Sequence, residues 1–527
     1  MRSSLVKFIL AVVVGLGLTT HTFGQTRGFA PVQNQYYNTQ SYNHSGSVYQ
    51  NAGFSQASDC AACEVGGSTV MEGYTTASYP GACTSCGVMS GGSCEACGPM
   101  MMGDPCAPTF EVGPYGLDMG CGMFPCAPSQ WFLNGWIQQG VTINPSWPDY
   151  KFNGTLRYND RANDYMLNQL YLSGGRAVNT DACMWDIGFR ADILYGTDYF
   201  FTSALGLETD TKNLAGYETN DPKAADLKWN SNDGPRRLGT AAMYGFSMPQ
   251  LYAEVQAPIG LNAKFGHFYS PMGHESVMAT QNFFYSHSYS MMYGEPATLT
   301  GMMLSQRICD GPMGSWTGYF GLNRGWDAWD TEIGDLSYMA GVKWENHFRT
   351  TSVGFLLNTG KNVIDPLVQG KVNTRTNYSL VFSHQLTPNL HYVLQHDLGI
   401  DKDATTENIN GTSNYLDGKW YSVSQYIYLQ MTQTLAFGCR AEWFKDENHS
   451  RVLGLREVRA TGTAFDYDVK GDEYVALSLG LNWKPTPFIA VRPEVRWDWV
   501  SGREMGPFND YTKNNQFLIG TDLVITF

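Results

Sequence analysis

The chain has 527 residues, of which 16% are charged and 14% are aromatic, and its formal net charge is −14. This acidic balance argues against nucleic acid as a partner, because binding a phosphate backbone requires a basic surface. No run approaches the ~18 apolar residues of a membrane-spanning helix, whereas strands with one lipid face and one water face fit the composition. One large membrane β-barrel with an extra N-terminal segment is therefore favoured over several soluble domains.

The N-terminus is typical of an exported protein. In residues 1–24, Arg2 and Lys7 precede an apolar run at 8–18, and this pattern predicts a secretory signal peptide. Residues 25–58 are rich in Gln, Asn, Ser and Tyr and have few aliphatic side chains, so this low-complexity segment should be disordered. The mature chain would then lie in an oxidising compartment, where cysteines form disulfides.

Residues 59–128 form a segment rich in Cys, Gly and Met. Its nine disulfide candidates are Cys60, Cys63, Cys83, Cys86, Cys94, Cys97, Cys106, Cys121 and Cys126. The first four also match the coarse spacing of a four-thiolate zinc site, but export favours disulfides, so neither a metal site nor a cofactor is predicted. Nine is an odd number, so one thiol stays free, pairs with another chain, or reaches Cys183, Cys309 or Cys439. We expect a cross-linked periplasmic segment.

Residues 129–527 are predicted to form an all-β, antiparallel transmembrane β-barrel. Apolar and polar residues alternate there in runs separated by turn residues, as expected of barrel strands. The candidate strands are 131–144, 165–174, 183–197, 249–257, 260–269, 296–306, 313–325, 336–347, 350–359, 376–387, 389–400, 417–431, 433–445, 472–484, 487–500 and 515–527. The prediction is about sixteen strands, within roughly 12 to 18, because strand boundaries are hard to place from sequence.

The end of the chain fixes the topology of the predicted barrel. Phe517, Ile519, Leu523, Ile525 and Phe527 share one face of the last strand, and Phe527 is interpreted as a closing-strand signal at the periplasmic rim. Short links then fall on the periplasmic side, and the longer links at 360–375, 401–416, 446–471 and 501–514 fall outside. An even strand number and a periplasmic N-terminal segment follow.

Charged residues of both signs recur opposite the apolar face of several strands. The pore-lining candidates are Asp186, Arg190, Asp192, Arg440, Glu442, Arg492, Glu494, Arg496 and Asp498. On one strand of a soluble sandwich such a face would simply be solvated; its recurrence favours the inner wall of a barrel with a polar lumen. Trp483, Trp497 and Trp420 lie near predicted strand ends and fit interfacial belts. Pro493 argues against an unbroken strand there, unless a local bulge accommodates it.

A dense local signature lies in residues 264–304. It comprises Lys264-Phe-Gly-His-Phe-Tyr-Ser-Pro-Met-Gly-His-Glu275, Phe283-Phe-Tyr-Ser-His-Ser-Tyr289 and Tyr293-Gly-Glu-Pro-Ala-Thr-Leu-Thr-Gly301. With Trp131-Phe-Leu-Asn-Gly-Trp136 and Leu167-Asn-Gln-Leu-Tyr171, this arrangement resembles the β-barrel porin family described as OmpL-like. The resemblance covers roughly residues 131–527. It implies an outer-membrane barrel and passive transport, and it names no specific solute.

The link at 270–295 is the third predicted outer connection. In general porins the third outer loop folds into the barrel, which makes this link the candidate constriction by analogy. Its titratable groups would be His274, Glu275, His287 and Glu295, for which ordinary loop hydrogen bonding is the alternative.

The predicted function is an outer-membrane porin that lets small hydrophilic solutes diffuse through a polar lumen, with outer-membrane lipids around it. Catalysis is not expected, because His287 and Ser288 point in opposite directions on an extended chain and no catalytic motif occurs. One alternative is a structural envelope protein anchored by the barrel and linked to an envelope partner through its cysteines. Another is a secreted soluble all-β binding protein. A homotrimer is expected by analogy with sixteen-stranded porins.

Overall fold

The computed structural model describes residues 131–180, 184–208, 243–329, 336–363, 372–409, 412–452, 454, 456–457, 471–501 and 505–527, together with a short strand, β1 (Leu117–Asp118). The predicted signal peptide, the low-complexity segment and the nine N-terminal cysteines lie outside these residues. Within the described part of the chain, no helix combines the length and the apolar character needed to cross a membrane.

Sixteen long strands make up the folded part of the chain, and each corresponds to one predicted strand. They are β2 (Trp131–Ile143), β3 (Tyr165–Arg176), β4 (Asp186–Gly196), β5 (Gly245–Gln256), β6 (Leu261–Tyr269), β7 (Thr298–Gly311), β8 (Gly314–Asn323), β9 (Ser337–Glu345), β10 (Thr351–Val363), β11 (Val372–Thr387), β12 (Leu390–Ile409), β13 (Thr412–Gln430), β14 (Leu435–Glu447), β15 (Asp472–Thr486), β16 (Ile489–Ser501) and β17 (Asn515–Thr526).

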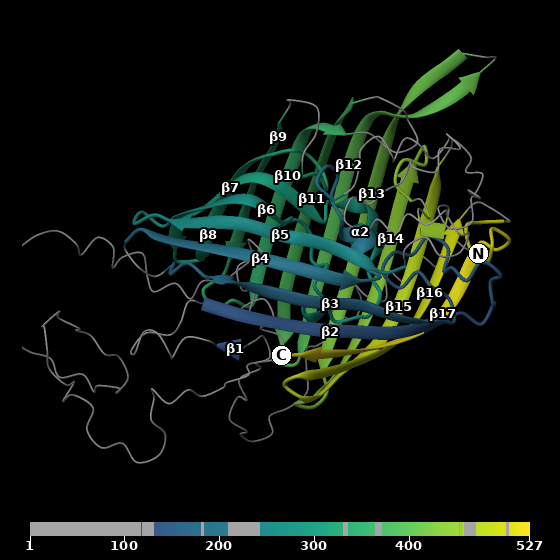
Figure 1. Cartoon of the computed structure of the whole chain (residues 1–527), viewed down its shortest axis with the longest axis horizontal. Coiled ribbons are helices and arrows are strands. Elements are labelled where there is room, and N and C mark those ends of the chain that lie inside the picture. The colour runs from purple at the N-terminus through teal and green to yellow at the C-terminus, as the bar shows by residue number, and fades with distance from the viewer. Residues whose placement is uncertain are drawn as a thin grey trace, which may run out of the picture. The chain divides into compact units, whose positions relative to one another are not determined.

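These strands close into an antiparallel barrel, which confirms the predicted fold class (Figure 1). Each strand from β2 to β17 pairs with its neighbours in the sequence, and β17 pairs with β2 to complete the ring. At this seam the backbone N–H and C=O of Phe527 bond those of Gly135 at 2.9 and 2.8 Å. Gln138 Nε2 also donates to Asp522 Oδ2 across the seam, at 2.8 Å. The barrel therefore leaves no unpaired edge between its first and last strands.

One end of the barrel carries the short turns and Phe527, and the other carries the long links; we call them the short-turn end and the long-loop end. Two links predicted to be long loops contain strand: β10 ends at Val363 and β11 begins at Val372, within the predicted loop 360–375, and β12 and β13 take up most of 401–416. The ends of β12 and β13 form a hairpin that projects beyond its neighbours (Figure 1). Most residues of the 401–416 stretch are polar, so it lacks the alternation that predicts a lipid-facing strand.

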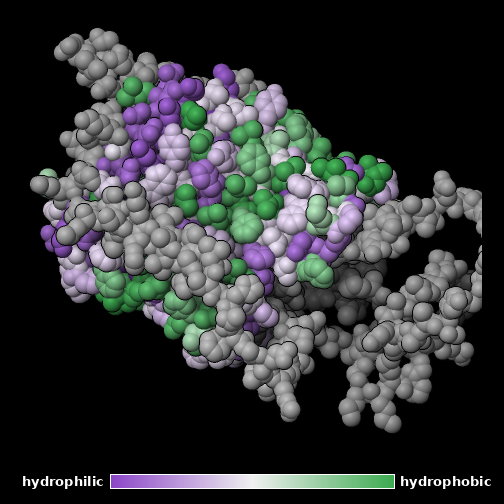
Figure 2. Space-filling view, turned by 180° about the vertical axis from the view of Figure 1, so that it is seen from behind, coloured by the Kyte–Doolittle hydropathy of each residue, from purple (hydrophilic) through white to green (hydrophobic). Residues whose placement is uncertain are grey.

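The two faces of the wall differ as predicted for a barrel in lipid. On β4, Ile187 and Ile193 point outward and are 65% and 49% exposed, whereas Arg190 and Asp192 point inward and are buried. Figure 2 shows hydrophobic and weakly polar residues over much of the wall, with strongly hydrophilic residues gathered toward its edges. This arrangement places apolar side chains against lipid and polar ones inside.

Two details of the sequence interpretation are wrong. Trp483 and Trp497 are exposed on the outer face, but Trp420 is fully buried inside the barrel, where its indole N–H donates to Gly294 O at 3.0 Å. Neighbouring residues of a strand alternate between faces, and Trp420 occupies an inward position of β13. Pro493 causes no bulge: it pairs in register with Thr521 of β17. On the other side, Glu494 pairs with Gly480 of β15 and Val491 pairs with Trp483, so the register of the two strands is the same before and after Pro493.

Two of the three later cysteines are described. Cys309 is exposed and Cys439 is half-buried on the outward face of β14, and neither forms a disulfide with another described residue. The position of Cys439 matches its interpretation as a lone small apolar residue of the outer face. Cys183 lies outside the described residues.

Candidate functional site: a loop folded into the barrel lumen

The link between β6 and β7, residues 270–297, lies inside the barrel; we call it L3. It contains a 3-10 turn, η5 (Ala279–Gln281), and a single π-helical turn, η6 (Ser290–Gly294). The residues of η6 are all buried, although the loop begins at the rim of the barrel. L3 reaches the wall across the lumen, since its residues form hydrogen bonds to strands β12 to β16. That it narrows a conducting pore stays a prediction.

Arginines of the inner wall bind the backbone carbonyls of L3. Arg440 Nη1 donates to Ser286 O, and Arg496 Nη1 donates to His287 O, both at 2.7 Å. Arg492 Nη1 donates to two carbonyl oxygens, those of Ala279 and Asn282, each at 2.8 Å. A guanidinium presents several N–H donors in a fixed plane, so one side chain can hold two turns of an irregular loop.

Carboxylates of the same wall bind the backbone amides of L3. Glu494 accepts hydrogen bonds from the N–H groups of Tyr285 and Ser286 at 3.1 Å. Glu442 accepts the N–H of Tyr289 at 2.6 Å. Non-helical backbone at membrane depth is stable only where protein or water satisfies its polar groups. In L3, the charged side chains of the inner wall satisfy these backbone polar groups.

The nine pore-lining candidates occupy distinct positions. Three arginines bond to an acid two residues later on the same strand, since residues i and i+2 share a face: Arg190 with Asp192, Arg440 with Glu442, and Arg496 with Asp498, at 2.7 to 2.8 Å. Arg492 bonds Asp522 of β17, and Glu494 binds L3. These residues are all buried inside the barrel. Asp186 differs: it pairs with Arg176 near the short-turn end and is partly exposed.

Three consecutive aromatic residues of L3 rest on wall positions where only glycine leaves space. A Cβ atom at Gly438 would come within 2.3 Å of the Phe283 ring, and one at Gly480 would lie 3.1 Å from Phe284. A Cβ atom at Gly140 would approach the Tyr285 ring to 2.7 Å. These contacts do not follow from the predicted strand pattern. Glycines at inward positions of otherwise well-formed strands are the signal that could have indicated a close approach.

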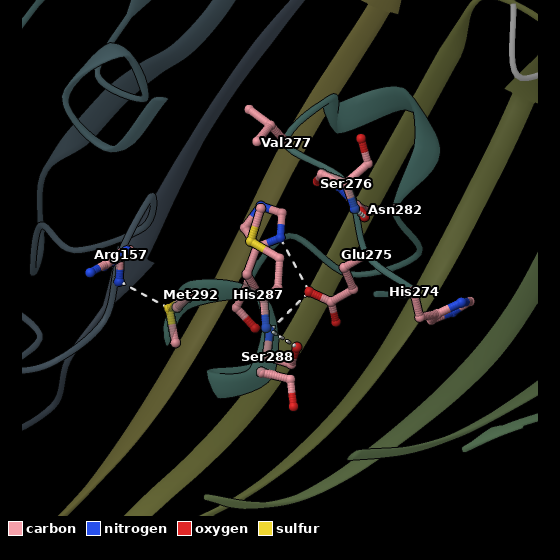
Figure 3. A network of polar contacts seen from close by, with 12 residues as sticks. Arg157, His274, Glu275, Ser276, Val277, Asn282, His287, Ser288 and Met292 are labelled. Atoms are coloured by element: carbon pink, nitrogen blue, oxygen red, sulfur yellow. Dashed lines mark hydrogen bonds and ion pairs between the residues drawn. The ribbon is translucent and has the colours of Figure 1, made fainter. Parts of the chain in front are cut away.

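Two of the predicted constriction groups, Glu275 and His287, form one network (Figure 3). Glu275 Oε1 lies 2.9 Å from Arg440 Nη1, and its Oε2 accepts the Ser288 N–H at 2.9 Å and lies 3.2 Å from His287 Nδ1. Burial alone raises the pKa of Glu275, but Arg440 and His287 outweigh it and hold that pKa well below its ordinary value. Glu275 is therefore a charged anchor between L3 and β14.

The other two groups, His274 and Glu295, meet through Gln395 of β12. Gln395 Oε1 accepts the His274 N–H at 2.9 Å, and its Nε2 donates to Glu295 at 3.3 Å. The His274 ring points away from Glu275 (Figure 3) and lies 3.1 Å from the Tyr428 hydroxyl. Burial lowers the pKa of His274 to about 4, so its ring is neutral at pH 7. Burial, aided by nearby carboxylates, raises the pKa of Glu295 well above its usual value and favours its protonated form.

The long-loop half of the barrel is filled by a buried apolar cluster, which the sequence did not predict. L3 contributes Tyr289 and Tyr293, the inner wall contributes Trp420 and Phe444, and the link after β8 contributes Trp326. The link between β2 and β3 joins it as well, since the backbone N–H of Arg157 donates to Met292 Sδ at 3.1 Å (Figure 3). Across the described residues, no group of three or more acidic, His or Cys side chains could hold a metal ion.

A family model described as beta-barrel porin-2, OmpL-like, matches residues 132–527. The chain belongs to this porin family. The match begins at the first strand of the barrel and ends at Phe527, so it covers the whole barrel and excludes the cysteine-rich segment. No curated protein matches the chain.

Solved structures of outer-membrane channels resemble the porin at low sequence identity. They include the outer membrane channel DcaP of Acinetobacter baumannii (9% identity, TM-score 0.44), the anion-selective porin from Comamonas acidovorans (9%, 0.43) and Salmonella typhi OmpF (11%, 0.41). The alignments cover 75%, 76% and 76% of this chain and 96%, 100% and 98% of those chains, respectively. Likeness at this level carries no solute preference over to the porin.

Replacing Arg440 should loosen the attachment of L3. In Arg440→Gln, Glu275 and Glu442 stay buried without their cation, and breaking such a buried network typically costs about 3 to 5 kcal/mol. We expect a matching loss in the free energy of unfolding, measured by tryptophan fluorescence in urea for the porin in micelles. The control is Lys402→Gln, since the Lys402 side chain is 59% exposed and its ion pair with Asp417 is worth about 0 to 1 kcal/mol. Equal losses in both variants would contradict the anchoring role.

Proposed function

We propose that the porin lets small hydrophilic solutes diffuse passively across an outer membrane. The observation that carries the proposal is the closed ring of sixteen antiparallel strands, with apolar residues outside and charged residues inside. Membership of a porin family supports the same function. No step in this function requires a reaction or a cofactor.

The proposal includes an orientation in the membrane. The short-turn end, with Phe527, faces the periplasm, and the long-loop end faces outward, because bacterial barrels place short turns on the periplasmic side. The N-terminal segment, which precedes β2, then starts from the periplasmic side. A homotrimer and a disulfide-linked envelope partner stay predictions.

Planar-bilayer recording tests the function directly. Full-length porin purified in detergent should insert and give stepwise ionic currents, as expected of a water-filled channel. A protein that only anchors the envelope would give no current, and the apolar cluster in the long-loop half is the feature that favours this second candidate. Heat-denatured protein from the same preparation serves as the control, because the current should require a folded barrel.

A further inference from the structure

A cavity lies between L3 and the inner wall at the short-turn half of the barrel. L3 residues Phe283 and Phe284 form one side. The barrel contributes Tyr428 of β13 and Lys484 of β15, and the short turn between β13 and β14 contributes Thr434. The cavity is thus built by the loop and the wall together, and neither alone provides it. Its position places it on the route of a solute between L3 and the short-turn end.

The aromatic residues of the cavity form a wall suited to a flat ring. The rings of Phe283 and Tyr428 are 4.9 Å apart at 36°, and Phe283 meets Phe284 at 4.9 Å and 63°. Phe284 and Tyr428 lie 6.4 Å apart at 43°. Such a cluster leaves inclined ring faces and edges toward the cavity, against which an aromatic ring packs favourably. The absence of a side chain at Gly438 and Gly480 leaves the space in which Phe283 and Phe284 lie against the barrel.

The unbalanced charge of the cavity is positive. Both oxygens of Glu275 are already bonded, to Arg440 on one side and to His287 and Ser288 on the other. Within the described residues, the Lys484 ammonium has no ion-pair or hydrogen-bond partner, and the charge acting on it is the like charge of Arg492. Lys484 therefore offers its ammonium group to an anion.

Two polar atoms of the lining add unused hydrogen-bonding capacity. His274 Nδ1 and Asn482 Oδ1 are buried and have no partner among the described residues. Their positions are fixed, because His274 Nε2 lies 3.1 Å from the Tyr428 hydroxyl and Asn482 Nδ2 donates to Phe283 O at 3.1 Å. Buried polar atoms are normally satisfied, so these two make the region beneath the aromatic wall under-bonded and polar.

We propose that this cavity is a binding subsite for small aromatic carboxylates. The carboxylate lies against the Lys484 ammonium, and the ring packs on the wall of Phe283, Phe284 and Tyr428. The inference rests on the proposed channel function, since it names the class of solute that the channel would hold on its way through. A plain anion lacks the ring contact, and a neutral aromatic lacks the charge contact.

Block of the ionic current by benzoate is the test. Benzoate added to the porin in a planar bilayer should reduce the current in a concentration-dependent way, at lower concentration than acetate or benzyl alcohol. Lys484→Gln should weaken the block about tenfold, the usual loss for a charge-assisted hydrogen bond, and Lys484→Arg should retain it. Lys402→Gln, on an exposed lysine at the long-loop end, should leave the block unchanged.

Other outcomes overturn the inference in distinguishable ways. Equal block by acetate indicates a simple anion site, and equal block by benzyl alcohol with no effect of Lys484→Gln indicates a neutral aromatic site. A silent bilayer refutes the proposed channel function instead. In that case, calorimetric titration of the detergent-solubilised porin with benzoate tests the subsite independently of the current. Binding that is weakened by Lys484→Gln supports the subsite, and the absence of binding refutes it.

Discussion

Replacing residues 274–292 by a short Gly-Ser linker is expected to raise the single-channel conductance of the porin several-fold. This part of L3 occupies the lumen and is held by Arg440, Arg492 and Glu494, so its removal exposes charged wall groups to water. A barrel of sixteen or more strands without such an obstruction encloses an aqueous channel. The measurement is the size of the current step in concentrated KCl, recorded for both proteins in the same lipid.

The matched control shortens the hairpin that projects beyond the barrel, by removing residues 406–415, so that Thr405 and Leu416 stay paired. That deletion takes chain from the long-loop end and leaves L3 and its partners in place, so the step size should not change. Gly438→Val is a milder version of the main test, because the new side chain would displace the Phe283 ring from its position against the wall. If the linker variant folds and its conductance equals that of the parent, L3 is not the constriction.

Deleting Phe527 is expected to reduce assembly of the barrel in the membrane sharply. Phe527 makes two backbone hydrogen bonds to Gly135, and its ring lies 2.8 Å from where a Cβ atom of Gly135 would be. Without these contacts the seam between β17 and β2 ends earlier, and the rim of the barrel has an open edge. The measurement is the fraction of membrane-inserted protein that migrates as a heat-modifiable folded band on a gel.

Phe348→Ala is the matched control for the terminal residue. Phe348 lies in the short turn between β9 and β10, at the same end of the barrel, and is 85% exposed. Losing this ring removes aromatic surface from the short-turn end without affecting the seam, so assembly should be normal. Normal insertion of the chain that lacks Phe527 would refute its role as a closing signal.

The strands were predictable because lipid imposes a simple rule on each of them. Along β15, Val475, Leu477 and Leu479 face outward and the residues between them face inward, so the pattern can be read without knowing any neighbour. The even strand number followed from the links and the last residue. The rule fails at the ends of β12 and β13, because most residues there are polar and do not alternate with apolar ones.

The arrangement inside the lumen could not be derived in the same way. Tyr285 meets Gly140, Asn168 and Glu494, which belong to three different strands, and no local pattern brings them together. The placement of L3 inside the barrel was foreseen only by analogy with other porins. Trp420 shows the same limit: its sequence neighbours suggested an interfacial residue, and its partner Gly294 is 126 positions away.

The hydrogen bonds between L3 and the inner wall also bear on the order of events during folding. The partners of Tyr285 and Ser286 on β16 lie 209 and 208 positions later in the chain, so they are synthesised long after the loop itself. Contacts between such distant segments form slowly, because a large chain loop must close first. The bonds between L3 and β16 can therefore form only after β16 has joined the barrel, so we expect this part of L3 to dock late in maturation.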